Sequence, residues 1–288
     1  KIKELMGKNN EALKELNIAE NLRPILLKVH LYKGYIYADM GMHNKALEAY
    51  NKLLLIGKDI GNEDERVKNT PQQIVFSRYD IEPSDLKYNY NIDLEFDYST
   101  CYYAIGKVYN IMGDTTLALD NFNKALSMTK HPDYYYDIGL LLETKKGDYY
   151  GAYEMYSTII DNYPSYYKAY ERRAELLYNR KKYEEAIADW SKLIEKGIAS
   201  AEVYSRRAHT YELLNKIEKA HKDIEALLSI EPDNIEYRIK YIELSLFLGM
   251  EELVIKETDF LLNIVESEKT IKLLYFFKII AMTIINSD

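Results

Sequence analysis

The chain has 288 residues, of which 47% are hydrophobic and 29% charged, and its formal net charge is −8. This balance excludes an intrinsically disordered chain, and the acidic excess argues against a nucleic-acid binder, which usually carries a basic face. With only 12 glycines and 6 prolines, the composition favours helices joined by short turns.

The cysteine content and the first residues bear on compartment and processing. Cys101 is the single cysteine, so no internal disulfide can form, and we expect a reducing, cytoplasmic environment. The sequence starts at Lys1 without an apolar leader, which indicates either a processed N-terminus or a piece of a longer protein.

Residues 1–60 contain the first expected helices. Residues 27–60 predict two amphipathic helices joined by a turn, because apolar residues recur with helical spacing. Residues 1–26 fit the second half of the same kind of unit and are interpreted as a partial repeat. The positions of the first full unit that return later in the chain are Gly34, Tyr37, Ala46, Tyr50 and Leu53.

Residues 61–98 break this pattern and are interpreted as an insert between repeats. The insert opens with a loop-like Gly-Asn-Glu-Asp-Glu-Arg run, and apolar and polar residues alternate strictly from Tyr90 to Tyr98. A period of two is typical of a β-strand, so the insert is predicted to form a small β-hairpin. Three interpretations stay open: a surface excursion, a segment that rims a binding groove, and an early start of the helix expected near Ser99.

After the insert the chain repeats itself. Blocks that begin at Tyr167, Ala201 and Ile235 are 34 residues apart and carry similar residues at matching positions. In one earlier block the turn at residues 145–147 carries an extra residue, and the last block is degenerate. The repeats are assigned to residues 27–60, 99–132, 133–166, 167–200, 201–234 and 235–268, followed by a C-terminal capping helix at 269–288.

Each block reads as two helices with facing apolar stripes. In the block 167–200, Tyr170 and Ala174 lie on one stripe and Ala186 and Trp190 on the other. The two alanines allow the helices to approach closely. One such pair cannot bury its apolar face alone, so neighbouring pairs are expected to stack.

This 34-residue frame resembles the tetratricopeptide repeat, in which an aromatic residue, Leu-Gly, Tyr, Ala, Phe, Ala and Pro follow at set spacings. The resemblance covers residues 1–60 and 99–268. It implies an all-α fold, a right-handed α-α superhelix of about six helix-turn-helix repeats plus the partial N-terminal unit. It also implies a concave groove that is lined by the first helix of each repeat and binds a protein or peptide.

The sequence contains no arrangement of residues typical of an enzyme. None of the five histidines has a metal-ligand spacing such as HExxH, and neither a glycine-rich phosphate loop nor a nucleophile elbow is present. Cys101 is expected to be a buried, unreactive thiol. We therefore expect no catalytic activity, no metal and no cofactor.

The resemblance places the partner-binding positions on the first helix of each repeat. Arg172, Arg206 and Lys240 recur every 34 residues, which predicts a basic column that could attract an acidic peptide segment. The candidate groove residues are Tyr103, Lys107, Tyr136, Lys168, Arg172, Arg206, His209 and Lys240.

Some of the basic residues in this region could have a structural role instead of binding a partner. Arg173 and Arg207 stand beside the column, and Asp189 and Asp223 recur on the second helices with the same period. Arginine–aspartate pairs between adjacent helices would explain these four residues as structure.

Chaperone-adaptor members of the family bind a peptide's C-terminal carboxylate with a five-residue clamp of lysine, asparagine and arginine. Lys168 and Arg172 match two positions of that clamp, whereas Tyr103, Lys107 and Asp137 occupy the other three. Asp137 would repel a carboxylate, so a clamp of this type is not expected.

The leading hypothesis is a protein-interaction scaffold that binds a peptide or partner protein in the groove, without binding nucleic acid. Two alternatives stay open. One is self-assembly through the apolar run at residues 273–285, which is interpreted as a buried or capping helix and is too short to cross a membrane. The other is a role as the interaction part of a larger regulator or enzyme. The sequence leaves the oligomeric state open.

Overall fold

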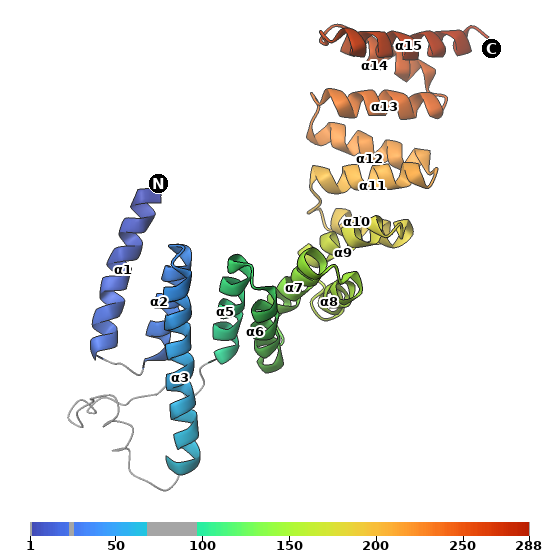
Figure 1. Ribbon diagram of the computed structural model, residues 1–288. Helices are drawn as coiled ribbons and strands as arrows, with labels where there is room; N and C mark the ends of the chain where they lie inside the picture. The colour runs from blue at the N-terminus through green and yellow to red at the C-terminus, as the bar shows by residue number, and fades with distance from the viewer. Residues whose placement is uncertain (1, 23–25, 68–96, 288) are drawn as a thin grey trace. The chain divides into compact units, whose positions relative to one another are not determined.

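The computed structural model describes residues 2–22, 26–67 and 97–287, and every regular element within these ranges is helical (Figure 1). The prediction of an all-α fold built from helix pairs is confirmed. The chain divides into two compact units, Lys1–Met155 and Tyr156–Asp288, and each unit is described by itself.

Unit 1 consists of an N-terminal helix followed by helix pairs. A π-helical turn at Leu142–Lys146 takes up the extra residue that the sequence predicts at this turn. Gly113, with φ 85°, closes the turn between two paired helices, and Asp114 caps the second of them. The helices are α1 (Ile2–Leu22), α2 (Leu27–Asp39), α3 (His43–Val67), α5 (Tyr98–Met112), α6 (Thr115–Met128), α7 (Pro132–Leu141) and the first half of α8 (Tyr149–Asn162).

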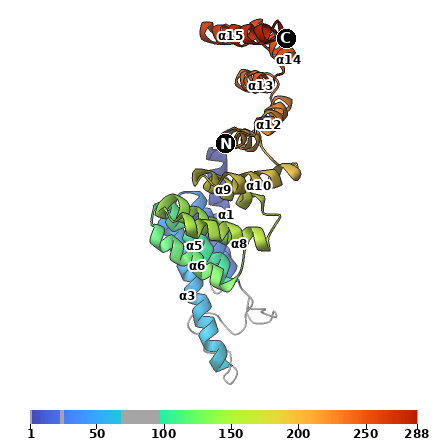
Figure 2. The same ribbon diagram turned by 90° about the vertical axis from the view of Figure 1, so that its right-hand side faces the viewer.

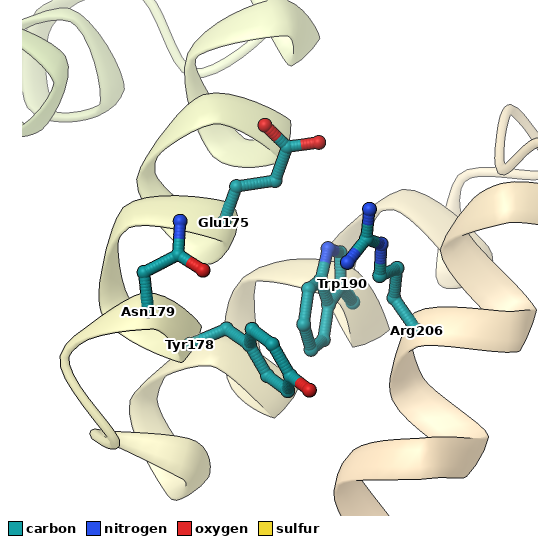
Figure 3. Close-up of a pocket in the computed structure, with 5 residues that line it drawn as sticks. All are labelled: Glu175, Tyr178, Asn179, Trp190 and Arg206. Atoms are coloured by element: carbon teal, nitrogen blue, oxygen red, sulfur yellow. The ribbon is translucent and has the colours of Figure 1, made fainter. Parts of the chain in front are cut away.

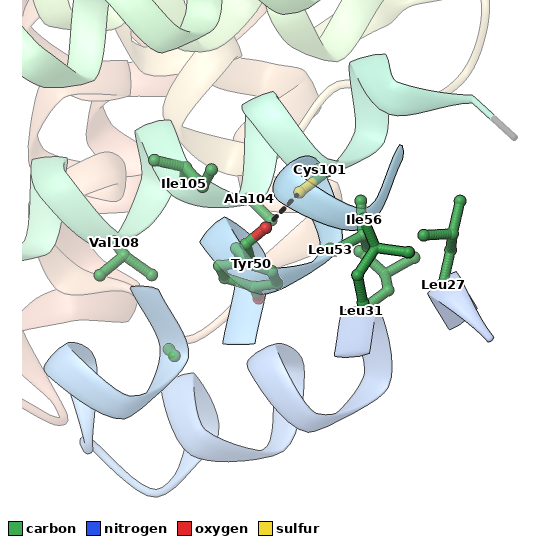
Figure 4. Packing of buried hydrophobic residues seen from close by; sticks show 10 residues of the cluster. Leu27, Leu31, Tyr50, Leu53, Ile56, Cys101, Ala104, Ile105 and Val108 are labelled. Carbon is green, nitrogen blue, oxygen red and sulfur yellow. Dashed lines mark hydrogen bonds between the residues drawn. The ribbon is translucent and has the colours of Figure 1, made fainter. Parts of the chain in front are cut away.

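The core of unit 1 joins α2, α3 and α5 (Figure 4). Tyr50, Leu53 and Ile56 of α3 are buried in one cluster with Cys101 and Ala104 of α5. Burial raises the pKa of the Cys101 thiol to about 12, so the thiolate needed for reaction is disfavoured. The prediction of a buried thiol at this position is confirmed.

Glycine sets the spacing within two helix pairs of unit 1. A Cβ atom at Gly34 would lie 2.1 Å from the Tyr50 ring, and one at Gly106 would lie 2.5 Å from the Phe122 ring. These distances are too short for carbon atoms, so the aromatic ring of the second helix needs a glycine on the first. The small residue in these two repeats therefore allows close helix packing.

Two expectations for the insert need correction. The loop-like start of the insert (61–66) instead continues α3, which ends at Val67, because extending an existing helix is much easier than starting one. Tyr98, expected at the end of a strand, is the first residue of α5, and Asp97 caps that helix by accepting a hydrogen bond from Ser99 N at 3.0 Å. The remainder of the predicted hairpin lies outside the described residues.

Unit 2 contains the second half of α8 and the most regular repeats. Helices α11 to α15 follow one another as neighbours within this unit (Figure 2). Lys181 and Asn215 take a positive φ and close the turns after α9 and α11. The helices are α9 (Tyr167–Asn179), α10 (Tyr183–Glu195), α11 (Ala201–Leu213), α12 (Ile217–Ile230), α13 (Ile235–Phe247), α14 (Glu251–Leu262) and α15 (Glu268–Ile285).

Helix α15 has one buried and one exposed apolar side. Leu274, Phe277 and Ala281 are buried in a cluster with residues of α13 and α14, whereas Phe276 is 58% and Ile279 is 62% exposed. Of the two interpretations of this apolar run, a helix buried on all sides does not fit, and a capping helix stays a prediction. No helix in the part of the chain that the structure describes is long and apolar enough to cross a membrane.

Candidate partner-binding surface

Helices α9, α11 and α13 of unit 2 carry a matching stripe of side chains, which we call the unit-2 stripe. On each helix three residues at positions i, i+3 and i+7 share one face, because such positions are adjacent on a helix surface. Corresponding residues are 34 apart in the chain. The stripe consists of Arg172, Glu175 and Asn179 on α9, Arg206, His209 and Leu213 on α11, and Lys240, Glu243 and Phe247 on α13.

The two arginines of the predicted basic column are paired with carboxylates of their own helices. Arg172 Nη1 donates to Glu175 Oε2 at 2.9 Å, and Arg206 Nε donates to Glu202 Oε1 at 2.7 Å. The Arg206 and Glu202 side chains are 46% and 60% exposed, so solvent weakens this pair and a ligand can compete for it.

Lys240 links two neighbouring first helices. Its ammonium group donates to Glu212 of α11 at 2.8 Å and to Glu243 of α13 at 3.0 Å. Burial alone would lower the pKa of Lys240, but the hydrogen bonds and charges of the two glutamates outweigh burial and raise it. The expected basic column is therefore a row of ion pairs with both signs of charge, because glutamates stand within reach of each cation.

A small hollow of about 130 Å³ lies in the stripe between α9 and α11 (Figure 3). Glu175, Asn179 and Arg206 supply hydrogen-bond acceptors and donors around it, and Tyr178 and Trp190 supply ring surface. Both kinds of hydrogen-bonding group in one small space suit an uncharged polar group, such as a peptide amide, as well as a single charge.

The third position of the stripe becomes apolar along unit 2. Asn179 occupies it on α9, whereas Leu213 is 48% exposed on α11 and Phe247 is 73% exposed on α13. Neither apolar residue is among the candidates predicted from the sequence. The signal was available, since each follows a residue of the basic column by seven positions, or two helical turns.

Two further candidates from the sequence are exposed on the first helices of unit 2. Lys168 lies one turn before Arg172 on α9, and the His209 ring centroid lies 6.2 Å from that of Tyr178. Lys168 therefore extends the exposed face of α9 by one turn, and His209 is already part of the unit-2 stripe.

In unit 1 the structure groups three of the residues that occupy clamp positions. Tyr103 donates its hydroxyl hydrogen to Asp137 at 2.7 Å, and the Lys107 ammonium lies 5.5 Å from the centre of the Tyr103 ring. Tyr136, the neighbour of Asp137 on α7, is half-buried. Because Tyr103 and Asp137 bond to each other, this group offers a tyrosine face and a lysine for weak contacts rather than a carboxylate clamp.

The predicted arginine–aspartate pairs beside the column are confirmed. Arg173 donates through Nε and Nη2 to both carboxylate oxygens of Asp189, at 2.8 Å each, and through Nη1 to Ser157 Oγ at 3.0 Å. These contacts tie α8, α9 and α10 together. The same network returns 34 residues later in Arg207, Asp223 and Ser191.

The unit-2 stripe therefore offers groups that suit binding. Its side chains supply hydrogen bonds, exposed ion pairs and apolar contact. Among the residues that the structure describes, no group of three or more histidine, cysteine, aspartate or glutamate side chains has a geometry that could hold a metal ion.

Comparisons with known proteins agree with the helix-pair fold. The tetratricopeptide repeat family model matches residues 27–59, 99–131 and 201–234. The crystal structure of YrrB, described as a TPR protein with an unusual peptide-binding site, aligns with a TM-score of 0.52 at 18% identity over 77% of this chain and 95% of that one. PilF of Pseudomonas aeruginosa aligns with a TM-score of 0.51 at 14% identity over 83% and 91% of the two chains. The chain thus contains tetratricopeptide repeats.

Curated relatives match over shorter stretches. RNA polymerase II-associated protein 3 of Homo sapiens is 29% identical over 126 residues, which are 43% of this chain and 19% of the relative. The Hsp70-Hsp90 organizing protein of Triticum aestivum is 25% identical over 133 residues, which are 45% of this chain and 21% of the relative. The matched region thus spans about a fifth of the length of each relative.

Proposed function

We propose that this chain is a non-catalytic protein-interaction scaffold and that the unit-2 stripe binds an extended peptide segment of a partner protein. The observation that carries the proposal is the repeated, exposed stripe of charged, polar and apolar side chains on α9, α11 and α13. Such a mixture suits protein recognition, because polar groups orient a ligand while apolar groups contribute affinity.

The stripe also suggests the chemistry of the segment. Leu213 and Phe247 offer contact area for one large apolar side chain, and Asn179 offers both a donor and an acceptor to a peptide backbone. Arg206 and Glu202 form an exposed pair, so neighbouring acidic and basic residues of the peptide can each find an opposite charge. We therefore favour a segment with one apolar anchor and charges of both signs.

A purely acidic segment is the second form of the proposal. Its carboxylates would compete for the arginines with Glu175 and Glu202, which already accept hydrogen bonds from them. That exchange replaces one ion pair with another and adds little affinity. The mixed segment avoids the exchange.

The names of similar proteins support a scaffold role in general terms. YrrB is described as having a peptide-binding site, one curated relative as an organizing protein for Hsp70 and Hsp90, and the other as associated with RNA polymerase II. Each of these descriptions concerns association with a peptide or another protein.

The test uses the full chain and three sets of short fluorescent peptides: one with a central Leu or Phe flanked by Glu and Lys, one purely acidic, and one purely polar. Fluorescence anisotropy should show the tightest binding for the mixed set. Leu213→Asp should weaken that binding by about tenfold or more, because it places a charge against the apolar anchor. Lys192→Glu on α10, an exposed second-helix position, is the matched control and should leave affinity unchanged.

Arg206→Glu separates the two forms of the proposal. It should abolish binding of a purely acidic segment but only weaken binding of a mixed segment, which keeps its apolar contact with Leu213 and Phe247. Unchanged affinity for all three peptide sets in both Arg206→Glu and Leu213→Asp would exclude the unit-2 stripe as the binding surface.

A further inference from the structure

The hollow between α9 and α11 has two walls that differ in hydrogen-bonding character (Figure 3). Glu175 and Asn179 of α9 lie on one side, and Trp190 of α10 and Arg206 of α11 lie on the other. An indole N–H and a guanidinium group only donate hydrogen bonds, whereas a carboxylate only accepts them. A group that binds in the hollow must therefore accept from one wall and donate to the other.

The groups around the hollow retain capacity for a ligand. Among the residues that the structure describes, the Trp190 indole N–H and the Asn179 carboxamide have no hydrogen-bond partner. Arg206 uses its Nε for Glu202, so its two Nη groups can bind a ligand. Glu175 accepts one hydrogen bond through Oε2, and a carboxylate can accept several at once. The chain itself thus leaves both walls able to bind.

The charges around the hollow argue against a charged ligand group. Arg172 is paired with Glu175 at 2.9 Å and Arg206 with Glu202 at 2.7 Å, so the two signs balance. A carboxylate in the hollow would be attracted by Arg206 but repelled by Glu175, and a cationic group would meet the reverse. An uncharged group with both a strong donor and a strong acceptor gains from both walls.

The size of the hollow suits the end of a side chain. Its volume of about 130 Å³ corresponds to about four water-sized groups. Trp190, which is only 1% exposed, closes one side of it. A peptide backbone has to enter and leave such a space, whereas a side chain enters and stops. The carboxamide of a glutamine, together with the methylene before it, matches the volume.

We propose that this hollow binds the side-chain carboxamide of a glutamine in the partner segment, a refinement that rests on peptide binding by the unit-2 stripe. The carboxamide oxygen accepts hydrogen bonds from Trp190 and Arg206, and its NH₂ group donates to Glu175. Asn179 can both donate and accept, so it binds either end of the carboxamide. The glutamine thereby fixes the position of the segment relative to its apolar anchor at Leu213.

Other side chains satisfy the two walls less well. Asparagine carries the same carboxamide on a shorter arm. Glutamate has the length of glutamine but replaces the donating NH₂ with a second acceptor, and methionine has a similar length without a strong donor or acceptor. Histidine offers one donor and one acceptor on a rigid ring. We therefore expect glutamine to bind most tightly, asparagine next, and the other three clearly more weakly.

A residue scan on the full chain tests the preference. Starting from the mixed peptide with a leucine anchor, each flanking position is changed in turn to glutamine, asparagine, glutamate, methionine or histidine, and affinity is measured by fluorescence anisotropy. At one position glutamine should bind about tenfold more tightly than glutamate or methionine, because those residues leave hydrogen-bonding groups of the hollow unmatched. Trp190 is the only tryptophan of the chain. Unlabelled glutamine peptide should therefore shift its emission more than the methionine peptide does.

Two variants connect the preference to the hollow. Glu175→Gln gives the α9 wall a group that can also donate, so the preference for glutamine over glutamate should fall to about twofold or less. Asn179→Leu should reduce the preference for glutamine over methionine while affinity for the methionine peptide stays the same. Asn123→Leu, at an exposed position of α6, is the matched control and should leave both preferences unchanged.

The outcomes separate this site from the proposed function. No binding by any peptide would overturn both together. Peptide binding with equal affinity for all five residues at every position would overturn the glutamine site alone, and weaker binding of every peptide by Asn179→Leu would then show that Asn179 contacts the peptide backbone. A preference for glutamate or histidine, or a glutamine preference that Glu175→Gln leaves unchanged, would also overturn the glutamine site.

Discussion

The two units use the same helix-pair frame but hold it together with different chemistry. In unit 1 two pairs of helices pack an aromatic ring directly on a glycine, Tyr50 on Gly34 and Phe122 on Gly106. In unit 2 the equivalent position holds Ala174, Ala208 and Ile242, all fully buried. The frame thus accepts different residues at this position, and the contacts that hold neighbouring helices together differ as well.

Unit 2 adds a charged network that returns in successive repeats. Arg173 bonds Asp189 on the second helix of its own pair and Ser157 on the helix before it, so one side chain joins three helices. The Arg173 side chain is 18% and the Asp189 side chain 6% exposed. The first helices of unit 2 can therefore expose a polar stripe without losing their attachment to neighbours. The two units should therefore differ in which single substitutions destabilise them most.

Removing Asp189 should have the largest effect. Asp189→Ala leaves the Arg173 guanidinium half-enclosed without its carboxylate and is expected to destabilise unit 2 by about 3 kcal/mol. Native-state hydrogen exchange of the α9 and α10 amides measures this loss locally, which matters because stacked repeats can open in parts.

The matched control is Asp120→Ala in unit 1. Asp120 also forms an ion pair, with Lys124 at 2.6 Å, but its side chain is 52% exposed. Its removal should change stability by less than about 0.5 kcal/mol. Similar losses for the two aspartates would show that the three-helix network contributes no more than a surface pair.

Residue size in unit 1 should give the next largest effect. Gly34→Ala adds a Cβ atom 2.1 Å from the Tyr50 ring, so the ring or the helix has to shift, and we expect about 2 kcal/mol of destabilisation. Gly7→Ala in α1 is the control, because a Cβ there meets nothing within 4 Å. That change should stabilise the helix by up to about 1 kcal/mol. Urea unfolding followed by circular dichroism measures the change in stability of each variant. A change of the same sign in both would contradict the packing argument.

The parts of this molecule that repeat were predictable from the sequence. The 34-residue period made both the small-residue position and the Arg173–Asp189 pair predictable. Residues 34 apart occupy equivalent positions in stacked repeats, so a contact made in one repeat is expected in the next. The glutamate partners of the basic column were also within reach of the sequence, since Glu175 and Glu202 stand three and four positions from their arginines.

Two features could not be predicted because the sequence pattern is ambiguous there. The Gly-Asn-Glu-Asp-Glu-Arg run contains turn-forming residues, yet it follows a long helix and extends it to Val67. The apolar run in α15 indicates a hydrophobic helix, but it does not indicate which side of that helix the rest of the chain covers. That side depends on which neighbours stack against it, which only the structure reveals.

The smallest expected effect on stability concerns a cluster of charged side chains in unit 1, whose contribution depends on pH. Glu20 of α1 accepts hydrogen bonds from Lys33 of α2 and Lys52 of α3. Burial alone would raise the pKa of Glu20, but the hydrogen bonds and charges of these lysines outweigh burial and lower it from 4.5 to about 2. The cluster therefore favours the folded state most when this carboxylate is charged.

The pH window follows from the direction of that shift. Above about 4.5 the carboxylate is charged in both states and its stabilisation is complete; as the pH falls from 4.5 towards 2 the unfolded chain binds the proton first, and the stabilisation is lost. Because the Lys52 side chain is 52% exposed, we expect about 1 to 2 kcal/mol rather than the full shift. Urea midpoints should show Glu20→Gln less stable than the parent at pH 7, with the deficit falling to less than about half of that value at pH 3. Glu48→Gln, at an exposed position of α3, should show no such convergence, and a pH-independent deficit in Glu20→Gln would mean that this glutamate acts through packing rather than charge.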